Sequence, residues 1–174
     1  RQEVNRFIVF VFYIFDQRFY RTHTMTELVQ LNFSEKYQIR LKQAQDKLYI
    51  FCLIRKKWLV YTPEEWVRQH VLNYLINDLG YSTSAIALEV AIDITGMRKR
   101  ADIVVYQQEK PFIMVECKAP HIAISQATFD QIARYNIVLG SQLLMVTNGL
   151  NHFYCMMDFV QKRYNFLKEL PKKG

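Results

Sequence analysis

Residues 101–120, ADIVVYQQEKPFIMVECKAP, are the stretch from which the fold can be inferred. Two apolar runs flank a short polar segment, a pattern that predicts a β-hairpin. Asp102 lies at the start of the first run, and Glu116 and Lys118 lie at the end of the second. Because side chains alternate along a strand, Glu116 and Lys118 share one face and Cys117 points to the other. An ionised group in an apolar strand is costly without a partner, so these charges need an explanation.

The register of this hairpin predicts that two carboxylates face each other. If the polar turn closes with Tyr106 opposite Phe112, antiparallel pairing brings Asp102 opposite Glu116. Directly opposed residues have Cβ atoms about 4.5–5.5 Å apart, and like charges there repel. Such a pair needs a cation, and oxygen ligands with open positions suit Mg²⁺ or Mn²⁺. Lys118, on the same face, is placed to orient or activate a metal-bound water.

The hairpin resembles the PD-(D/E)XK nuclease superfamily, and its surroundings resemble the N-terminal nuclease domain of type I restriction enzyme R subunits. The similarity extends over roughly residues 31–171. Ala101 stands in place of the Pro in the superfamily's name, at a position that carries no ligand. The blocks that carry the resemblance, in the family's order, are TPEEWVRQ (62–69), KRADIVVY (99–106), VECKAP (115–120), FDQIARYN (129–136) and VTNG (146–149).

The resemblance implies metal-dependent hydrolysis of phosphodiester bonds in DNA. Asp102 and Glu116 would hold Mg²⁺, or Mn²⁺, together with the main-chain carbonyl of Cys117. Lys118 would position or activate the attacking water. It also implies DNA as the partner, with other restriction-system subunits as further partners. Target choice in type I enzymes lies in another subunit, so no sequence specificity is expected here.

The segment 62–79 predicts the first helix. Thr62 caps it, and Glu65 completes a capping box with Thr62. Glu64 falls at helical spacings that place it on the apolar face. The type I family has a Glu four residues before an Arg in this helix, which matches Glu64 and Arg68. Glu64 is therefore the predicted further catalytic and metal-binding acid, with Glu65 as its competitor.

A second helix is predicted over 126–139, capped by Ser125 and ended by Gly140. Gln131 and Tyr135 are four residues apart and so project together. They resemble the QxxxY pair that follows the nuclease motif in R subunits. The resemblance implies a role in activity, by holding the nucleic acid or the shape of the site. Taken alone, they are an ordinary Gln and a half-buried Tyr.

Cations cluster in a predicted turn before Asp102 and in another turn beside Trp58. Lys and Arg contacts with phosphates supply most nonspecific affinity for nucleic acid, although solvated turns are an equally good interpretation. Glu89, in the preceding strand, is predicted to lie at a sheet edge or to pair with one of these cations, and the alternative is that it is a further acid of the site. The predicted nucleic-acid-binding residues are Arg98, Lys99, Arg100, Lys56, Lys57 and, from the first helix, Arg68.

The order of predicted elements indicates an α/β fold. It consists of a restriction-endonuclease-like core, with a mixed central sheet and flanking helices, preceded by a β meander. Residues 1–24 are predicted to be an upstream extension or the result of a misplaced start, or otherwise an added element packed on the core. Residues 25–62 are predicted to form an N-terminal β-rich segment of the same domain, and residues 63–174 are predicted to form the nuclease core with closing strands and a basic tail.

The composition narrows the class of protein. Of 174 residues, 51% are hydrophobic, enough for one domain with a core, and the net charge of +7 favours a polyanionic partner. Three scattered cysteines without a CxxC pair indicate a reduced, cytoplasmic protein with neither disulfides nor a zinc site. The apolar run 7–15 is too short to span a bilayer, so no membrane association is expected.

R subunits join their nuclease domain to an ATP-driven translocase, but this sequence has no Gly-rich phosphate loop. The chain is therefore expected to work alone, to act in trans with a partner, or to come from a truncated gene. Two other functions stay open. One is a noncatalytic nucleic-acid-binding or assembly module on a nuclease fold. The other is a core protein in which Glu116 and Lys118 merely pair, which would leave Asp102 unbalanced.

Overall fold

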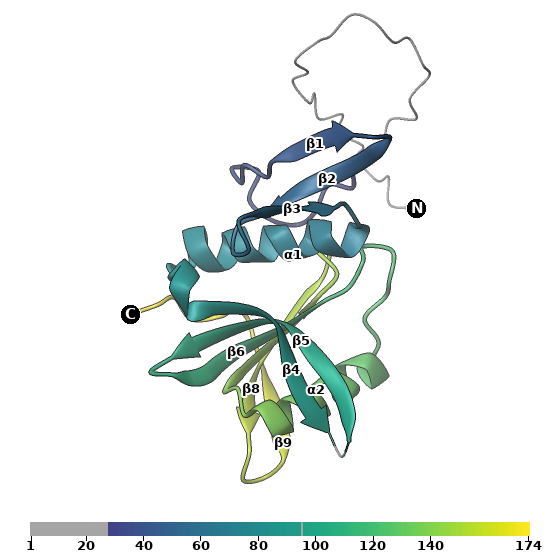
Figure 1. The fold of residues 1–174 in the computed structure, drawn as a ribbon. Helices are drawn as coiled ribbons and strands as arrows, with labels where there is room; N and C mark the ends of the chain where they lie inside the picture. The colour runs from purple at the N-terminus through teal and green to yellow at the C-terminus, as the bar shows by residue number, and fades with distance from the viewer. Residues whose placement is uncertain (1–27, 95) are drawn as a thin grey trace, which may run out of the picture.

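The computed structural model describes residues 28–94 and 96–174, and they form four layers (Figure 1). A small sheet lies on α1, α1 lies on one face of a large sheet, and α2 covers the other face. The predicted α/β class, with a mixed central sheet after a β meander, is confirmed. The prediction for residues 1–24 falls outside the described residues. No helix within 28–94 or 96–174 has the length and apolar character needed to cross a membrane.

The meander is a three-stranded antiparallel sheet in the order β1-β2-β3. Its first turn, at Gln45 and Asp46, has positive φ values of 48° and 60° at both residues, which matches the right-handed twist of the strands. Ile50 and Cys52 alternate with outward residues and are fully buried on the side that faces α1. The three strands are β1 (Leu41–Ala44), β2 (Lys47–Cys52) and β3 (Lys57–Val60).

Among the described residues, the large sheet has six strands in sequence order, and only β6 and β7 run parallel. Parallel neighbours need a crossover, and α2 supplies it. This single crossover makes the sheet mixed and places α2 on the face away from α1. The strands are β4 (Ile86–Ile94), β5 (Met97–Gln107), β6 (Lys110–Cys117), β7 (Leu143–Thr147), β8 (His152–Asp158) and β9 (Arg163–Leu167).

Both helices begin and end much as their capping residues predict. In α1 (Pro63–Asn73) the Glu65 amide donates to Thr62 Oγ1 at 3.0 Å. The predicted helix continues to residue 78, but its last part is a π-helical segment, Tyr74–Asp78. In α2 (Gln126–Leu139) the cap is Ser125, and Gly140 ends the helix with a left-handed φ of 78°. A short 3₁₀ turn, Thr83–Ala85, leads into β4.

The two faces of the large sheet form separate apolar cores because neighbouring residues point in opposite directions. On one face, Ile113 and Val115 pack with α1 and with Ile50 of the meander. On the other face, Met114 packs with Phe129 of α2. The meander and the large sheet therefore share one core through α1.

Gly149 lies at a close contact between three segments. Its φ is +82°, and a Cβ there would lie 2.8 Å from Leu31 Cδ2 and 3.0 Å from Val67 Cγ2. Its carbonyl accepts a hydrogen bond from the Asn32 amide at 2.7 Å. The turn after β7 thus holds the N-terminal segment against α1.

We expect Gly149→Ala to lower the free energy of unfolding by about 2–4 kcal/mol, because it adds a clash in a packed core to left-handed strain. The matched control is Gly80→Ala, since Gly80 has φ +79° and nothing lies within 4 Å of the added carbon. That change should cost only about 1 kcal/mol. Urea denaturation of both variants makes the comparison, and equal losses would contradict the close contact.

His70 is a residue of α1, and its neutral side chain packs against aromatic rings. Its ring centroid lies 4.3 Å from that of Trp66 and 5.7 Å from that of Phe33, and its Nδ1 lies 2.8 Å from the Trp66 carbonyl oxygen. Burial lowers the pKa of His70 from 6.5 to about 4, against a weaker opposite effect of the Trp66 carbonyl. The folded pKa is below the unfolded one, so protonation favours the unfolded chain.

Stability should therefore fall as the pH drops from about 6.5 towards 4, by about 2 kcal/mol between pH 7 and pH 5 from this residue. In His70→Asn, whose amide can still donate to Trp66, this part of the loss should disappear. Exposed His121, replaced by Asn, serves as the control and should keep the full loss. Urea denaturation at the two pH values measures the effect, and an unchanged pH dependence in His70→Asn would contradict it.

Candidate active site

The β5–β6 hairpin has a different register near its turn than further along the strands. Tyr106 pairs with Pro111, so the predicted pairing of Tyr106 with Phe112 is wrong. A two-residue turn closes the hairpin one residue out of the expected register, and a bulge between Val105 and Tyr106 then shifts the pairing back. Beyond the bulge Ile103 pairs with Val115, and this register continues towards Asp102 and Glu116.

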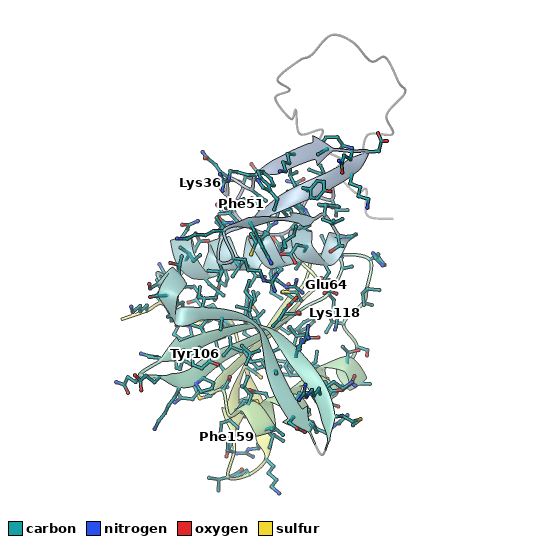
Figure 2. All side chains as sticks on the ribbon, viewed as in Figure 1. Lys36, Phe51, Glu64, Tyr106, Lys118 and Phe159 are labelled. Carbon is teal, nitrogen blue, oxygen red and sulfur yellow. The ribbon has the colours of Figure 1, made fainter. Side chains whose placement is uncertain are left out.

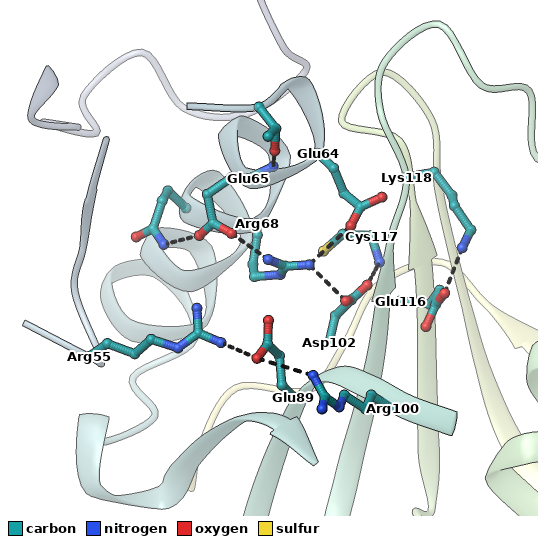
Figure 3. A network of polar contacts seen from close by, with 12 residues as sticks. Arg55, Glu64, Glu65, Arg68, Glu89, Arg100, Asp102, Glu116, Cys117 and Lys118 are labelled. Atoms are coloured by element: carbon teal, nitrogen blue, oxygen red, sulfur yellow. Dashed lines mark hydrogen bonds and ion pairs between the residues drawn. The ribbon is translucent and has the colours of Figure 1, made fainter. Parts of the chain in front are cut away.

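Asp102, Glu116 and Lys118 come together at the end of β6 (Figure 3). The Cys117 amide donates to Asp102 Oδ2 at 2.7 Å, and Lys118 Nζ donates to Glu116 Oε1 at 2.6 Å. The Cys117 side chain points the other way and is fully buried in the core shared with α1. The side-chain directions along this strand are therefore those predicted from alternation.

Arg68 connects α1 to this cluster. Its Nη2 lies 2.8 Å from Asp102 Oδ1 and 3.1 Å from Glu64 Oε1, and its Nη1 donates to Glu65. Burial by itself would lower the pKa of Arg68, but the Asp102 and Glu65 carboxylates outweigh it and raise the pKa. The guanidinium stays charged, and Arg68 as a whole is only 7% exposed. Its position is that of a buried link, with little surface left for the nucleic-acid contact predicted for it.

The prediction that Glu64 lies on the apolar face of the first helix is wrong, and the buried acid of the first helical turn is Glu65. Glu64, placed on the apolar face by spacing, has a side chain that is 45% exposed, whereas that of Glu65 is 7% exposed. The reason is that α1 lies between two sheets, so the face towards the meander is buried as well. Glu65 Oε1 also accepts from Gln69 Nε2 at 2.8 Å, a structural contact inside the helix. Glu64 is the acid that faces the cluster (Figures 2 and 3).

The carboxylates influence one another through space. Burial, with the charge of Asp102 adding to it, raises the pKa of Glu116 to about 7, and the hydrogen bond from Lys118 opposes this rise. Burial would lower the pKa of Lys118, but Glu116 outweighs it and raises the pKa. Burial raises the pKa of the Cys117 thiol well above its usual value, so the thiol stays neutral. Any role of Cys117 in the site is then one for its main chain.

Each of the two central acids has an ion-pair partner, although Arg68 is shared with Glu64 and Glu65. Asp102 pairs with Arg68 and Glu116 pairs with Lys118. The expectation that Asp102 would be left unbalanced without a metal is therefore wrong. Among residues 28–94 and 96–174, no three His, Cys, Asp or Glu side chains are arranged as a set of metal ligands.

Gln131 and Tyr135 project together on α2, as their spacing predicts. Gln131 Nε2 donates to the Tyr135 hydroxyl at 2.6 Å. Lys99 Nζ lies 5.7 Å from the centre of the Tyr135 ring. Within the described part of the chain, neither side chain has a hydrogen bond or ion pair with the Asp102 cluster. Their neighbour is the basic run of β5.

The basic run Arg98–Lys99–Arg100 is part of β5, so the prediction that it forms a turn is wrong. The three residues pair with Asp93, Ile92 and Ala91 of β4, because the strands continue as a long ribbon to the bend at Gly96. Glu89 lies on the edge strand β4 and pairs with Arg100 at 3.9 Å, as predicted, and with Arg55 at 2.9 Å. Lys56 and Lys57 are exposed beside Trp58 in and after the turn between β2 and β3.

Sequence reasoning missed the contact between Arg68 and Asp102. The spacing of Glu64, Glu65 and Arg68 signals pairs within one helix turn. A partner 34 residues later leaves no such periodic signal. Arg55, which links the meander to Glu89, was missed for the same reason.

The fold and the site define a mixed α/β domain with an Asp-Glu-Lys cluster at the end of a central strand. The family follows from the sequence. A family model described as "Type I restriction enzyme R protein N terminus (HSDR_N)" matches residues 63–171, which is more than half of the chain. The chain belongs to this family.

A solved structure is similar to this chain as well. It is a fragment assigned as an HsdR subunit of a type I restriction enzyme from Vibrio vulnificus YJ016, with 21% sequence identity and a TM-score of 0.47. The match covers 64% of this chain and 24% of the fragment, so this chain corresponds to about a quarter of that protein's length. No curated protein matches the chain.

We expect Arg68→Met to lower the free energy of unfolding by about 3–5 kcal/mol, because it leaves buried carboxylates without their cation. Arg55→Met is the matched control, since Arg55 pairs with a Glu89 side chain that is 43% exposed. That change should cost about 1 kcal/mol or less. Urea denaturation compares the two, and equal costs would argue against a central role for Arg68.

Proposed function

We propose that this chain is a metal-dependent nuclease domain of the PD-(D/E)XK type, with a restriction-endonuclease-like core, that hydrolyses phosphodiester bonds in DNA. The observation that carries the proposal is the meeting of Asp102, Glu116 and Lys118 at the end of β6. Membership of the type I R-protein family supports it, because that family is part of a restriction system. We further propose other restriction-system subunits as partners and a cytoplasmic location.

The donor chemistry of the site fits a hard divalent cation. Asp102, Glu116 and Glu64 come from three different elements, and the charges of Asp102 and Glu64 both raise the pKa of Glu116. Crowded carboxylate oxygens are the ligands that Mg²⁺ and Mn²⁺ prefer. These three side chains and the main-chain carbonyl of Cys117 would hold the ion, but in this structure the three are not gathered as a ligand set, so binding would require them to move together. A bound ion would lower the pKa of a water ligand and polarise the phosphate.

Lys118 is assigned an electrostatic role. Its contact with Glu116 raises its pKa, so it stays protonated at neutral pH. A protonated amine cannot accept a proton, but it can orient a water molecule and stabilise negative charge that develops on the scissile phosphate. We therefore favour charge stabilisation and water positioning over general-base catalysis by Lys118.

Arg68 acts in this proposal as a positioning residue. It holds Asp102 Oδ1, while the Cys117 amide holds Oδ2, so both oxygens of the carboxylate are oriented. Gln131 and Tyr135, beside Lys99, are proposed to hold the nucleic-acid backbone on the α2 side of the sheet. The remaining proposed phosphate contacts are Arg98, Arg100, Lys56 and Lys57.

A second candidate function is a noncatalytic nucleic-acid-binding or assembly module. The observation in its favour is that Asp102 and Glu116 each have a cation partner from the chain itself. In this alternative, the ion pairs hold α1 on the hairpin and have no chemical task. The two functions differ in what a divalent metal does to the protein and to DNA.

Cleavage of supercoiled plasmid and linear duplex distinguishes them. With Mg²⁺ or Mn²⁺ the wild type should cut, with EDTA it should not, and Lys118→Ala should be slower by about a hundredfold or more. Lys110→Ala removes an exposed lysine at the other end of β6 and should cut within about twofold of wild type. Cutting that persists in EDTA or in Lys118→Ala would overturn the metal-nuclease proposal.

Metal binding has a readout that does not depend on cutting. Because a ligand of the native state raises its stability, Mg²⁺ or Mn²⁺ should raise the melting temperature of the wild type. The rise should be lost in Asp102→Asn. A wild type that binds DNA with a steep salt dependence, shows no shift with either metal and never cuts would establish the noncatalytic module.

A further inference from the structure

The outer face of the meander is covered by aromatic and basic side chains. Residues alternate along β1–β3, and the inward set, which includes Ile50, packs towards α1. The outward set lies on the side away from α1, and Phe51 marks it in Figure 2. None of its aromatic rings belongs to either apolar core. The outward side chains are Arg40, Lys42, Tyr49, Phe51, Trp58 and Val60.

Cations and rings alternate across the strands of this face. The Arg40 Cζ lies 3.5 Å from the centre of the Phe51 ring, and the Lys42 Nζ lies 4.4 Å from that of Trp58. Lys42 also lies 5.7 Å from the ring of Tyr49. The three rings are half-buried, and the two cations are exposed. The outer face of the meander is therefore a continuous layer in which aromatic rings lie next to cationic side chains.

Most of the chain's net charge is on the same segment. Residues 36–60 contain seven Lys and Arg side chains and one acid, Asp46, a formal charge of +6 against +7 for the whole chain. This segment lies outside the residues matched by the family model. The attraction to a polyanion is therefore concentrated on the meander, and the aromatic face lies at its centre.

We propose that this face, made by Arg40, Lys42, Tyr49, Phe51 and Trp58, binds single-stranded nucleic acid. Bases would stack on the rings and on the outer side of the Arg40 guanidinium, while lysines pair with phosphates. A duplex hides the faces of its bases, and an acidic peptide has no bases to stack, so the rings favour a single strand. Binding here does not require that the Asp102 cluster cut DNA.

The test is fluorescence anisotropy with labelled oligothymidylate about 20 nucleotides long, in EDTA so that metal-dependent cutting cannot interfere. A matching oligouridylate compares RNA with DNA, and a duplex tests the preference for single strands. Inorganic polyphosphate of equal charge, used as a competitor, separates stacking from charge alone. The oligothymidylate should bind about tenfold more tightly than the duplex or the polyphosphate.

Two variants test the face itself. Trp58→Ala removes a stacking ring and should weaken binding about tenfold. The double variant Arg40→Gln, Lys42→Gln changes only exposed side chains, so this protein should fold even if the Trp58→Ala variant does not. It should weaken binding about tenfold and reduce the salt slope by about one. The matched control is the double variant Lys110→Gln with Lys162→Gln. It removes two exposed cations from the large sheet, one at the start of β6 and one in the turn between β8 and β9, and should stay within about twofold of wild type.

Three results would overturn the proposal. The first is equal weakening by the two charge-removing double variants. The second is equal affinity for oligothymidylate and polyphosphate, and the third is equal affinity for single strand and duplex. Circular dichroism of each variant shows whether it is folded, so that a loss of binding can be assigned to the face.

Discussion

A buried guanidinium, that of Arg68, joins the helix α1 to the hairpin that carries the site. Removing a charge from water costs several kcal/mol, and this is recovered only when good partners surround it. Arg68 has three carboxylate partners, from Glu64, Glu65 and Asp102, although its Nε has no hydrogen-bond partner among the described residues. The position of α1 on the sheet and the orientation of Asp102 therefore depend on the same ion network.

The location of α1 between two sheets explains several features at once. A helix covered on one side shows a single apolar stripe, but α1 is covered by the meander on one side and by the large sheet on the other. Glu65 is buried for this reason, while Glu64 remains at the open end beside the cluster. The meander thereby lies on α1 with Ile50 directed into the shared core, and its aromatic and basic residues are on the opposite face of the small sheet. In our proposals the two surfaces have separate tasks, one chemical and one in binding.

The carboxylates of the cluster at the end of β6 can be balanced in two ways, by side-chain cations or by a divalent metal ion. In this structure, Arg68 and Lys118 compensate Asp102 and Glu116. A divalent cation would compete with Lys118 for Glu116, whose pKa of about 7 reflects burial next to Asp102. Under the nuclease proposal, Asp102 and Glu116 would hold the metal, and Lys118, no longer paired with Glu116, would face the phosphate. Under the binding-module alternative, the ion pair is the final state.

The sequence by itself determined the features that depend on local periodicity and capping. These features include the two helices with their caps at Thr62 and Ser125, and the order of helices and strands along the chain. They also include the opposite directions of the Cys117 and Lys118 side chains. Each follows from residues that are close together in the sequence. The tertiary structure decided the rest, because it depends on contacts between distant segments. The burial of Glu65 and the pairing of Asp102 with Arg68 arise only when α1 packs between the sheets. The bulge that shifts the register between Val105 and Tyr106 is decided by the pairing of β5 with β6.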